Sequence, residues 1–358
     1  MEWKEDVLGN VLEVKYGKDH KKLADGQYPV YGSGGLMRYV DSKLYDGPSI
    51  LIPRKGTLNN IMFVESPFWT VDTMFWSIIN TDKVDPKFLF YSICKRDFAS
   101  MNVGSAVPSM TVNILNDIQI SYPKNIEDQR RIASILSSLD RKIELNNKIN
   151  ADLEEMAQAI FKNWFVDFEP FKDGKFVDSE LGMIPEGWKV GCLGDIAEIT
   201  SGKRPPKKSK DKTKELFIPL IGASDIMGFT SDVLYERSIL VIGRVGTHGV
   251  VQRFQEKCWP SDNTLVIESS YYNYVYQLLK GIDYSAINRG STQPLITQTD
   301  VKNTDVIIAP ENVLKEYESI TSTLFSKHRA NIKENSRLSL LRDTLLPRLM
   351  SGELEIPE

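Results

Sequence analysis

Several kinds of chemistry are excluded by what this 358-residue sequence lacks. The three cysteines, Cys94, Cys192 and Cys258, are far apart, and the three histidines are scattered, so neither a zinc site nor a disulfide framework is expected. A reduced, cytoplasmic setting is the natural one. No run of about 18 apolar residues is present that would span a membrane. The acidic, polar start lacks the basic and apolar regions of a secretory signal.

Catalytic motifs are also missing. There is no phosphate-binding loop of the G-x-x-x-x-G-K-[ST] type. There is also no Asn/Asp-Pro-Pro-Tyr/Phe run of an amino-methyltransferase. The glycine-rich segment 31–35 lacks the context of a dinucleotide site. We therefore expect a chain that binds rather than transforms its partner and carries no cofactor or metal of its own. The net charge of −4 shows no basic excess, so any contact with nucleic acid must come from local charge.

What the sequence does contain is a long internal repeat. Residues 50–57 return as residues 240–247, and at the same offset of about 190, Trp69 corresponds to Trp259 and Asp72 to Asp262. The offset is too long for a solenoid, so two whole globular units are duplicated. Each unit of about 125 residues is long enough to bury a core of its own. Short strand-like runs separated by turns, with a helical patch, predict an α+β fold with a strand-rich body.

A heptad pattern follows the first unit. Apolar and asparagine residues alternate at spacings of four and three. This pattern predicts a continuous helix over residues 126–163, which would be about 57 Å long at 1.5 Å per residue. Such a helix must project from its domain and needs a partner for its apolar stripe. Asparagines in the seam cost stability but specify register. The predicted seam is Ile132, Leu136, Leu139, Ile143, Asn146, Asn150, Leu153 and Ile160.

A second long helix follows the second unit, with Leu324, Leu338, Leu341 and Leu345 in its seam and Lys327, Asn331 and Glu334 as interruptions. Two helices with unsatisfied stripes are expected to form an antiparallel coiled-coil pair, which would relate the two units by a pseudo-two-fold axis. The predicted divisions are two globular domains at 1–124 and 184–309, long helices at 125–170 and 310–352, and a connector at 171–183.

Basic stretches occupy matching places in the two units. Each is either a solvated loop or a loop that contacts nucleic-acid phosphates; both interpretations stand, and the presence of such a stretch in both copies favours the second. The candidates are Lys203, Arg204, Lys207, Lys208 and Lys210 in the second unit and Lys21 and Lys22 in the first.

Further candidates for contact with bases lie at strand ends and in loops. Arg54 and Arg244 close matching strands, and an arginine there either donates two bonds to guanine or pairs structurally with Asp72 or Asp262. Glutamine is suited to adenine. The remaining candidates are Tyr31, Ser33, Arg38, Lys55, Ser105, Ser291, Thr292 and Gln293.

Four segments resemble the DNA-specificity subunit of type I restriction-modification systems. Residues 160–170 resemble the motif after the family's central helix, and residues 184–188 resemble the start of its second recognition domain. Residues 127–133 resemble its helix opening and 345–352 its C-terminal motif. The second helix lacks the Glu-Gln pair with which helices of this family often open.

The resemblance implies a non-catalytic subunit whose two target-recognition domains each read half of a bipartite DNA sequence, while the helices set the unread gap. It implies two methyltransferase subunits that use S-adenosylmethionine, and restriction-translocase subunits that use ATP and Mg²⁺. Two other classes stay open on the residues alone: a self-contained methyltransferase or nuclease, which would need a catalytic motif, and a coiled-coil scaffold with two protein-binding heads.

Overall fold

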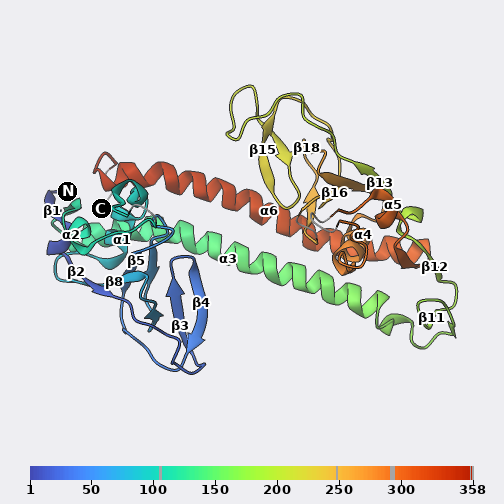
Figure 1. Cartoon of the computed structure of the whole chain (residues 1–358), viewed down its shortest axis with the longest axis horizontal. Coiled ribbons are helices and arrows are strands. Elements are labelled where there is room, and N and C mark those ends of the chain that lie inside the picture. The colour runs from blue at the N-terminus through green and yellow to red at the C-terminus, as the bar shows by residue number, and fades with distance from the viewer. Residues whose placement is uncertain (105–106, 247–248, 291–294, 355, 357–358) are drawn as a thin grey trace. The chain divides into compact units, whose positions relative to one another are not determined.

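The computed structural model describes residues 1–104, 107–246, 249–290, 295–354 and 356. The chain divides into two compact units: unit 1 comprises Met1–Asn147 with Ile332–Glu358, and unit 2 comprises Lys148–Asn331. Two 40-residue helices, α3 (Ile126–Phe165) and α6 (Glu311–Met350), each contribute one end to each unit (Figure 1). No helix within the described ranges is long and apolar enough to cross a membrane.

Unit 1 contains a four-stranded antiparallel sheet of order β2-β8-β5-β6, a three-stranded sheet of order β4-β3-β7 and the pair β1-β9. The strands are β1 Trp3–Val7, β2 Leu12–Tyr16, β3 Tyr28–Gly32, β4 Gly35–Val40, β5 Ser49–Pro53, β6 Met62–Val64, β7 Trp69–Thr70, β8 Met74–Ile79 and β9 Gln119–Pro123. The helices before α3 are η1 Leu8–Asn10, α1 Pro86–Ile93, η2 Phe98–Met101 and α2 Val112–Asn116.

Unit 2 repeats this topology strand for strand, with sheets β13-β19-β16-β17 and β15-β14-β18 and the pair β12-β20, plus a short hairpin β10-β11. The strands are β10 Phe176–Val177, β11 Ile184–Pro185, β12 Lys189–Cys192, β13 Glu198–Ser201, β14 Ile218–Ile221, β15 Ile226–Thr230, β16 Ile239–Gly243, β17 Val251–Phe254, β18 Trp259–Pro260, β19 Thr264–Glu268 and β20 Asp305–Ile308. Its short helices are η3 Glu169–Phe171, η4 Leu193–Asp195, α4 Tyr272–Gly281 and α5 Gln298–Lys302.

The predicted α+β class with two similar strand-rich parts is confirmed by this shared strand order. Central strands β5 and β16 are buried along their whole length, as their continuous apolar sequences require. The adjoining strand β8 is buried at five of its six positions, whereas burial alternates in β2 at the edge of the sheet. The duplicated sequence therefore produces a duplicated sheet arrangement in each unit.

The long helices are built into the cores of the units. In unit 1, Ile132 and Leu136 of α3 are fully buried in the same apolar cluster as Leu349 of α6 and Phe88 of α1. The entry to α3 is capped because the Asn125 side chain accepts a hydrogen bond from the Glu127 N–H.

The other end of α3 closes on an aromatic cluster in unit 2. The Phe165 ring lies 4.6 Å from that of Tyr274 in α4 and 5.0 Å from that of Tyr317 in α6. Phe168 lies 5.5 Å from Trp188. The motif that follows the central helix thus fixes that helix to the second strand-rich body, because tilted and edge-to-face aromatic pairs bury large areas with defined geometry.

Candidate nucleic-acid interface

The basic loop of unit 2 is held as a strap whose two ends are bonded to the sheet. We call residues 203–209 the strap of unit 2. At its start the Lys203 N–H donates to Pro260 O at 3.0 Å, and the Trp259 indole donates to Lys203 O at 2.7 Å. At its end Ser209 and Phe229 exchange both backbone hydrogen bonds. Between these points Lys203, Arg204, Lys207 and Lys208 are exposed, and Lys210 is exposed directly after the strap.

The corresponding strap of unit 1, residues 18–25, begins with the same bonds. The Lys18 N–H donates to Thr70 O at 2.9 Å, and the Trp69 indole donates to Lys18 O at 3.0 Å. Lys21 and Lys22 are exposed on it. The equivalent tryptophans therefore have a role that sequence patterns did not reveal: they anchor the start of each basic strap.

Each strap is preceded by a glycine that no other residue can replace without movement. A Cβ added at Gly17 would lie 2.0 Å from Val71 O, and one at Gly202 would lie 2.1 Å from Ser261 O. These contacts are with backbone atoms, which cannot move aside cheaply. Both straps are therefore brought to the sheet by the same close approach.

Arg38 shapes the strap of unit 1. Its guanidinium donates to Leu23 O at 3.0 Å and forms an ion pair with Asp25 at 2.9 Å. The predicted partner residues Tyr31 and Ser33 lie on or next to the neighbouring strand β3, and both are half-buried. Burial raises the pKa of the Tyr31 hydroxyl. Arg38 thus has a positioning role in addition to any contact with DNA.

Arg54 and Arg244 occupy equivalent places. Their N–H groups donate to Thr73 O and Asn263 O, each at 2.8 Å. The Arg54 guanidinium lies 5.4 Å from the Tyr16 ring and donates to the backbone oxygen of Asp72. In the part of the chain that is described, no ion pair joins either arginine to the aspartate of its own unit, and the contact of Arg54 with Asp72 is made through the backbone oxygen. Lys55 is exposed next to Arg54.

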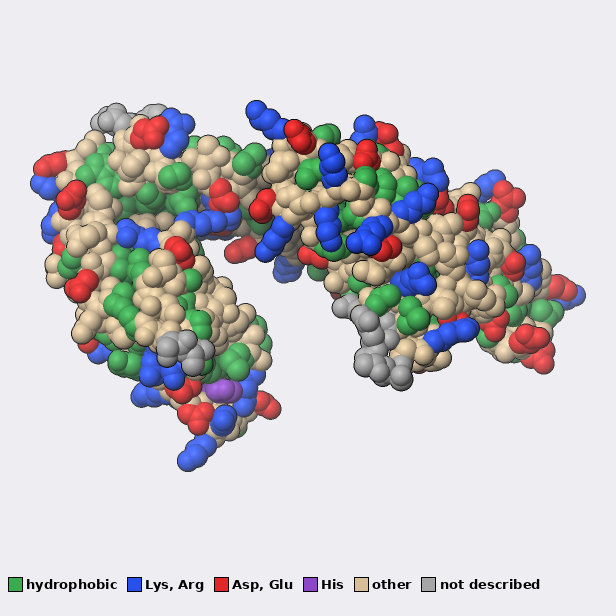
Figure 2. Space-filling view, turned by 45° about the horizontal axis from the view of Figure 1, so that its top comes forward, with side chains coloured by type: hydrophobic (Ala, Val, Ile, Leu, Met, Phe, Trp, Pro, Cys, Tyr) green, Lys and Arg blue, Asp and Glu red, His purple; other side chains and the backbone are tan. Residues whose placement is uncertain are grey.

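Four predicted contact residues, Ser105, Ser291, Thr292 and Gln293, lie outside the described residues. On the face drawn in Figure 2, Lys and Arg side chains are interspersed with Asp and Glu and form no continuous basic surface. Attraction for phosphates on that face is therefore local, because charges more than about 8–10 Å apart are screened at physiological salt.

The long helices pack antiparallel in each unit. In unit 1, Asn146 donates to Asn335 at 2.8 Å and to Glu334 at 2.9 Å. In unit 2, Asn331 donates to Asn150 at 2.9 Å, and Asn331 is 1% exposed. The two predicted seam asparagines therefore have partners, and two of the predicted interruptions, Asn331 and Glu334, supply hydrogen bonds across the pair. The matching four-residue spacing of asparagines in the two helices was the signal in the sequence.

The other seam positions vary in burial. Ile132 and Leu136 are buried, whereas Leu341 is 46% exposed because its neighbour Arg342 faces α3. Leu341 is thus not a seam residue at this level of the pair, and a polar side chain takes its place. Half-buried positions are Leu139, Ile143, Leu153, Ile160, Leu324, Leu338 and Leu345.

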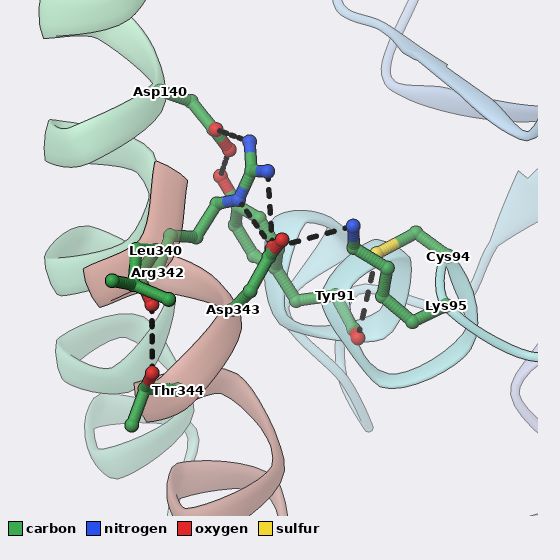
Figure 3. Close-up of polar contacts among 8 residues, drawn as sticks. All are labelled: Tyr91, Cys94, Lys95, Asp140, Leu340, Arg342, Asp343 and Thr344. Carbon is green, nitrogen blue, oxygen red and sulfur yellow. Dashed lines mark hydrogen bonds and ion pairs between the residues drawn. The ribbon is translucent and has the colours of Figure 1, made fainter. Parts of the chain in front are cut away.

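Arg342 belongs to a polar cluster in unit 1 that joins α1, α3 and α6 (Figure 3). Asp140 accepts hydrogen bonds from the Tyr91 hydroxyl and from Arg342, both at 2.6 Å. Asp343 pairs with Arg342 at 3.0 Å and with Lys95 at 3.3 Å. Burial raises the pKa of the nearby Cys94 thiol to about 11, so this cysteine is protonated and unreactive at neutral pH.

The equivalent region of unit 2 keeps one such bond, from the Tyr276 hydroxyl of α4 to Glu154 of α3 at 3.1 Å, but its arginine and its helix start are held differently. The Arg253 guanidinium lies 3.5 Å from the centre of the Phe325 ring and 4.5 Å from that of Tyr276, and it donates to Asn273. Glu318 of α6 accepts the N–H groups of Asn273 and Tyr274, both at 2.8 Å, at the start of α4. Burial raises the pKa of the Glu318 carboxyl to about 7.

No group of three or more His, Cys, Asp or Glu in the described ranges could hold a metal ion. The geometry offers instead two anchored basic straps, strand-end arginines and a hydrogen-bonded helix pair. The straps place exposed positive charge on each unit, and the asparagine bonds join the two long helices within each unit.

Comparison with known proteins identifies the family. Residues 1–155 and 185–337 match the model of the type I restriction modification DNA specificity domain. The MjaIX specificity subunit of Methanocaldococcus jannaschii is 31% identical over an alignment of 377 positions that covers 94% of this chain and 86% of that protein. The HindI specificity subunit of Haemophilus influenzae is 24% identical, covering 82% of this chain and 83% of that protein.

A crystal structure of the type I restriction-modification S subunit from M. genitalium has the same fold, with a TM-score of 0.69 at 16% identity over 99% of this chain and 97% of that one. The match of the family model over both repeats settles the classification that the four motifs predicted. This chain belongs to the type I restriction-modification specificity subunits, the non-catalytic, DNA-recognising members of their complexes.

Proposed function

We propose that this chain reads a bipartite DNA target in the cytoplasm, with one half-sequence contacted by each target-recognition domain. These domains are residues 1–124 and 184–309, joined through the connector 171–183. The long helices, residues 125–170 and 310–352, set the unread gap between the half-sequences.

The observation that carries this proposal is the duplicated strap. Each unit holds an exposed basic loop by the same tryptophan and the same backbone bonds, next to a sheet of the same order. Two equivalent surfaces that have diverged in side chains are suited to two different half-sequences. Phosphate contacts fix position and are insensitive to sequence, whereas contacts to base edges specify it.

The straps supply the phosphate contacts through Lys21 and Lys22 in unit 1 and through Lys203, Arg204, Lys207 and Lys208 in unit 2, and Lys210 adds a contact directly after the second strap. The strand-end arginines Arg54 and Arg244 contact bases, because a guanidinium can donate two bonds to guanine. Tyr31, Ser33, Arg38, Lys55, Ser105, Ser291, Thr292 and Gln293 complete the proposed DNA surface.

The partners are two methyltransferase subunits docked on the helices, and restriction-translocase subunits bound to that assembly. S-adenosylmethionine, ATP and Mg²⁺ belong to those partners. Shared phosphate contacts with the methyltransferase subunits would account for specific binding by a chain whose own net charge is −4.

A genome-wide methylation map of cells that carry this chain with its methyltransferase tests the proposal. We expect a split motif: two short defined sequences separated by a fixed number of unspecified bases. A continuous motif, or methylation by this chain alone, would contradict it.

The role of the helices is tested separately by lengthening both. Four residues inserted between Asn147 and Lys148 and four between Asn331 and Ile332 leave the asparagine pairs of each unit intact. About one added turn extends each helix by about 6 Å, and DNA rises about 3.4 Å per base pair. We expect the gap to grow by about one or two base pairs while both half-sequences stay the same. Changed half-sequences would refute the role of the helices as a spacer.

A further inference from the structure

A cavity of about 410 Å³ in unit 2 is lined by its basic strap and by the segment that follows β18. The strap contributes Arg204, Lys207 and Lys208, and the segment contributes Ser261, Asp262 and Asn263. Leu220 and Met227 add apolar surface. Because the strap is bonded to the sheet at both ends, the cavity exists in the free chain.

Its charge pattern is mixed. Three cations suit a phosphate, but Asp262 is exposed in the same cavity, and among the described residues no ion pair joins it to them. A carboxylate opposes phosphate binding, so a site for phosphate alone would not include one. The carboxylate accepts hydrogen bonds only, so it suits a ligand group that donates them.

Only two of the four DNA bases present a hydrogen-bond donor in the major groove. In the major groove, cytosine presents its N4 amino group and adenine its N6 amino group, whereas guanine O6 and thymine O4 are acceptors that a carboxylate repels. An aspartate beside phosphate-binding cations therefore favours amino-bearing bases and rejects the other two. Asn263, adjacent to it, carries both a donor and an acceptor.

A second observation points to a ligand. Ser261 is 3% exposed, and its buried hydroxyl has no hydrogen-bond partner among the described residues. Ser261 also lines an adjoining cavity of about 300 Å³, which shares Met227 and Asn263 with the first. A buried hydroxyl without a partner is costly in the free protein, and a ligand that bonds to it would remove that cost.

We propose that this cavity is a base-recognition pocket in which Asp262 selects cytosine or adenine. Asn263 and the Ser261 hydroxyl complete its hydrogen bonds, while Lys207 and Lys208 hold the neighbouring phosphate. This inference rests on the proposed function and adds to it the residue and the class of base at one position. Unit 1 has Val71, Asp72 and Thr73 at the equivalent places, so the aspartate is shared and its two neighbours differ.

The test uses the complex of this chain with its methyltransferase subunits. Methylation rates are measured on duplexes that carry every single-base change in the target, for the wild type and for Asp262→Asn. An asparagine can donate as well as accept, so guanine or thymine becomes acceptable at one position of one half-sequence. We expect discrimination there to fall on the order of tenfold.

Asp232→Asn is the matched control. It removes the same charge from an exposed position of unit 2 that does not line the cavity. It should leave discrimination unchanged at every position. If Asp262→Asn changes all sequences equally, or leaves discrimination intact, the pocket is refuted while a split motif in the wild type still supports the proposed function. A wild-type complex with no split motif overturns both.

Ser261→Ala separates a ligand-binding hydroxyl from a structural one. Removing an unpartnered buried hydroxyl should leave the unfolding temperature of the free chain equal or higher. The same change should weaken binding of target DNA severalfold if the hydroxyl bonds to the base. Unchanged DNA affinity would remove Ser261 from the pocket.

Discussion

Units 1 and 2 share one topology, and in both a tyrosine of the helix that follows the central sheet, α1 or α4, donates to a carboxylate of α3, but the remaining contacts of these two helices differ. In unit 1, α1 is capped by its own Asp85, and Tyr91 is tied through Asp140 to Arg342. In unit 2, α4 has no side-chain cap of its own at Tyr271, and Glu318 of α6 accepts its first N–H groups.

The side chains that surround one arginine in each unit differ as well. Arg342 of unit 1 pairs with carboxylates, whereas Arg253 of unit 2 lies against the rings of Tyr272, Tyr276 and Phe325. Either environment suits an arginine, because its planar guanidinium can form two parallel hydrogen bonds to a carboxylate and can also stack on an aromatic ring. The duplicated fold thus tolerates different interior chemistry, and each unit can be weakened separately.

The largest effect is expected from Asp140→Ala, which affects unit 1 only. It leaves the Tyr91 hydroxyl without its partner and removes one of the two carboxylates that pair with Arg342, which together costs about 3 kcal/mol of unfolding free energy. Hydrogen exchange should show faster opening of α1 while α4 is unchanged. Glu144→Ala, at an exposed position of the same helix, is the control. Equal loss of protection in both units would show that the two fastenings are not independent.

A smaller, pH-dependent effect is expected from Glu318→Gln in unit 2. Burial raises the pKa of this carboxyl from 4.5 to about 7, so the folded unit binds a proton that the unfolded chain releases. The contribution of this group to stability is therefore complete below pH 4.5 and is lost as the pH rises to about 7.

Glutamine keeps an acceptor for the α4 N–H groups without a charge. The variant should be more stable than the wild type by about 2 kcal/mol at about pH 8 and should lose the decline between about pH 4.5 and 7. Thermal unfolding across this range measures it, with the exposed Glu316→Gln as the control. A decline that persists in Glu318→Gln would assign it to another group.

The smallest effects are expected in the straps, where the two units should behave alike. The test replaces both lysines of one strap with neutral residues: Lys207 and Lys208 in one variant, Lys21 and Lys22 in another. The slope of log affinity against log salt concentration should fall by about 0.9 for each DNA phosphate that the strap no longer neutralises. DNA binding by the assembled complex at several salt concentrations measures it. A slope that changes for one pair alone would show that only one strap contacts the DNA backbone.

The sequence predicted the architecture better than the individual contacts. The repeat and the heptad spacing predicted two similar units and two long helices, and the shared strand order and 40-residue helices confirm them. The spacing of apolar residues predicts which face of a helix is buried. That prediction holds where the face packs on other apolar side chains, as at Ile132 and Leu136. It failed at Leu341, where the side chain that faces α3 is the charged Arg342.

The strap anchors were beyond the reach of sequence patterns for a related reason. Nothing near Lys203 in the chain indicates that Trp259, 56 residues away, will donate a hydrogen bond to its backbone oxygen. The same holds for Ser261 and Asp262, which have no motif of their own and become a pocket only because the strap passes beside them.

By itself the sequence determined the duplication, the alternation of strands and turns, and the helices with a seam. These depend on local spacing and on which side chains avoid water. Tertiary structure alone decided which polar groups meet, such as Asn331 with Asn150 across 181 residues of chain. A buried hydrogen bond stabilises only when both partners arrive in one geometry, and that geometry is set by how whole elements pack.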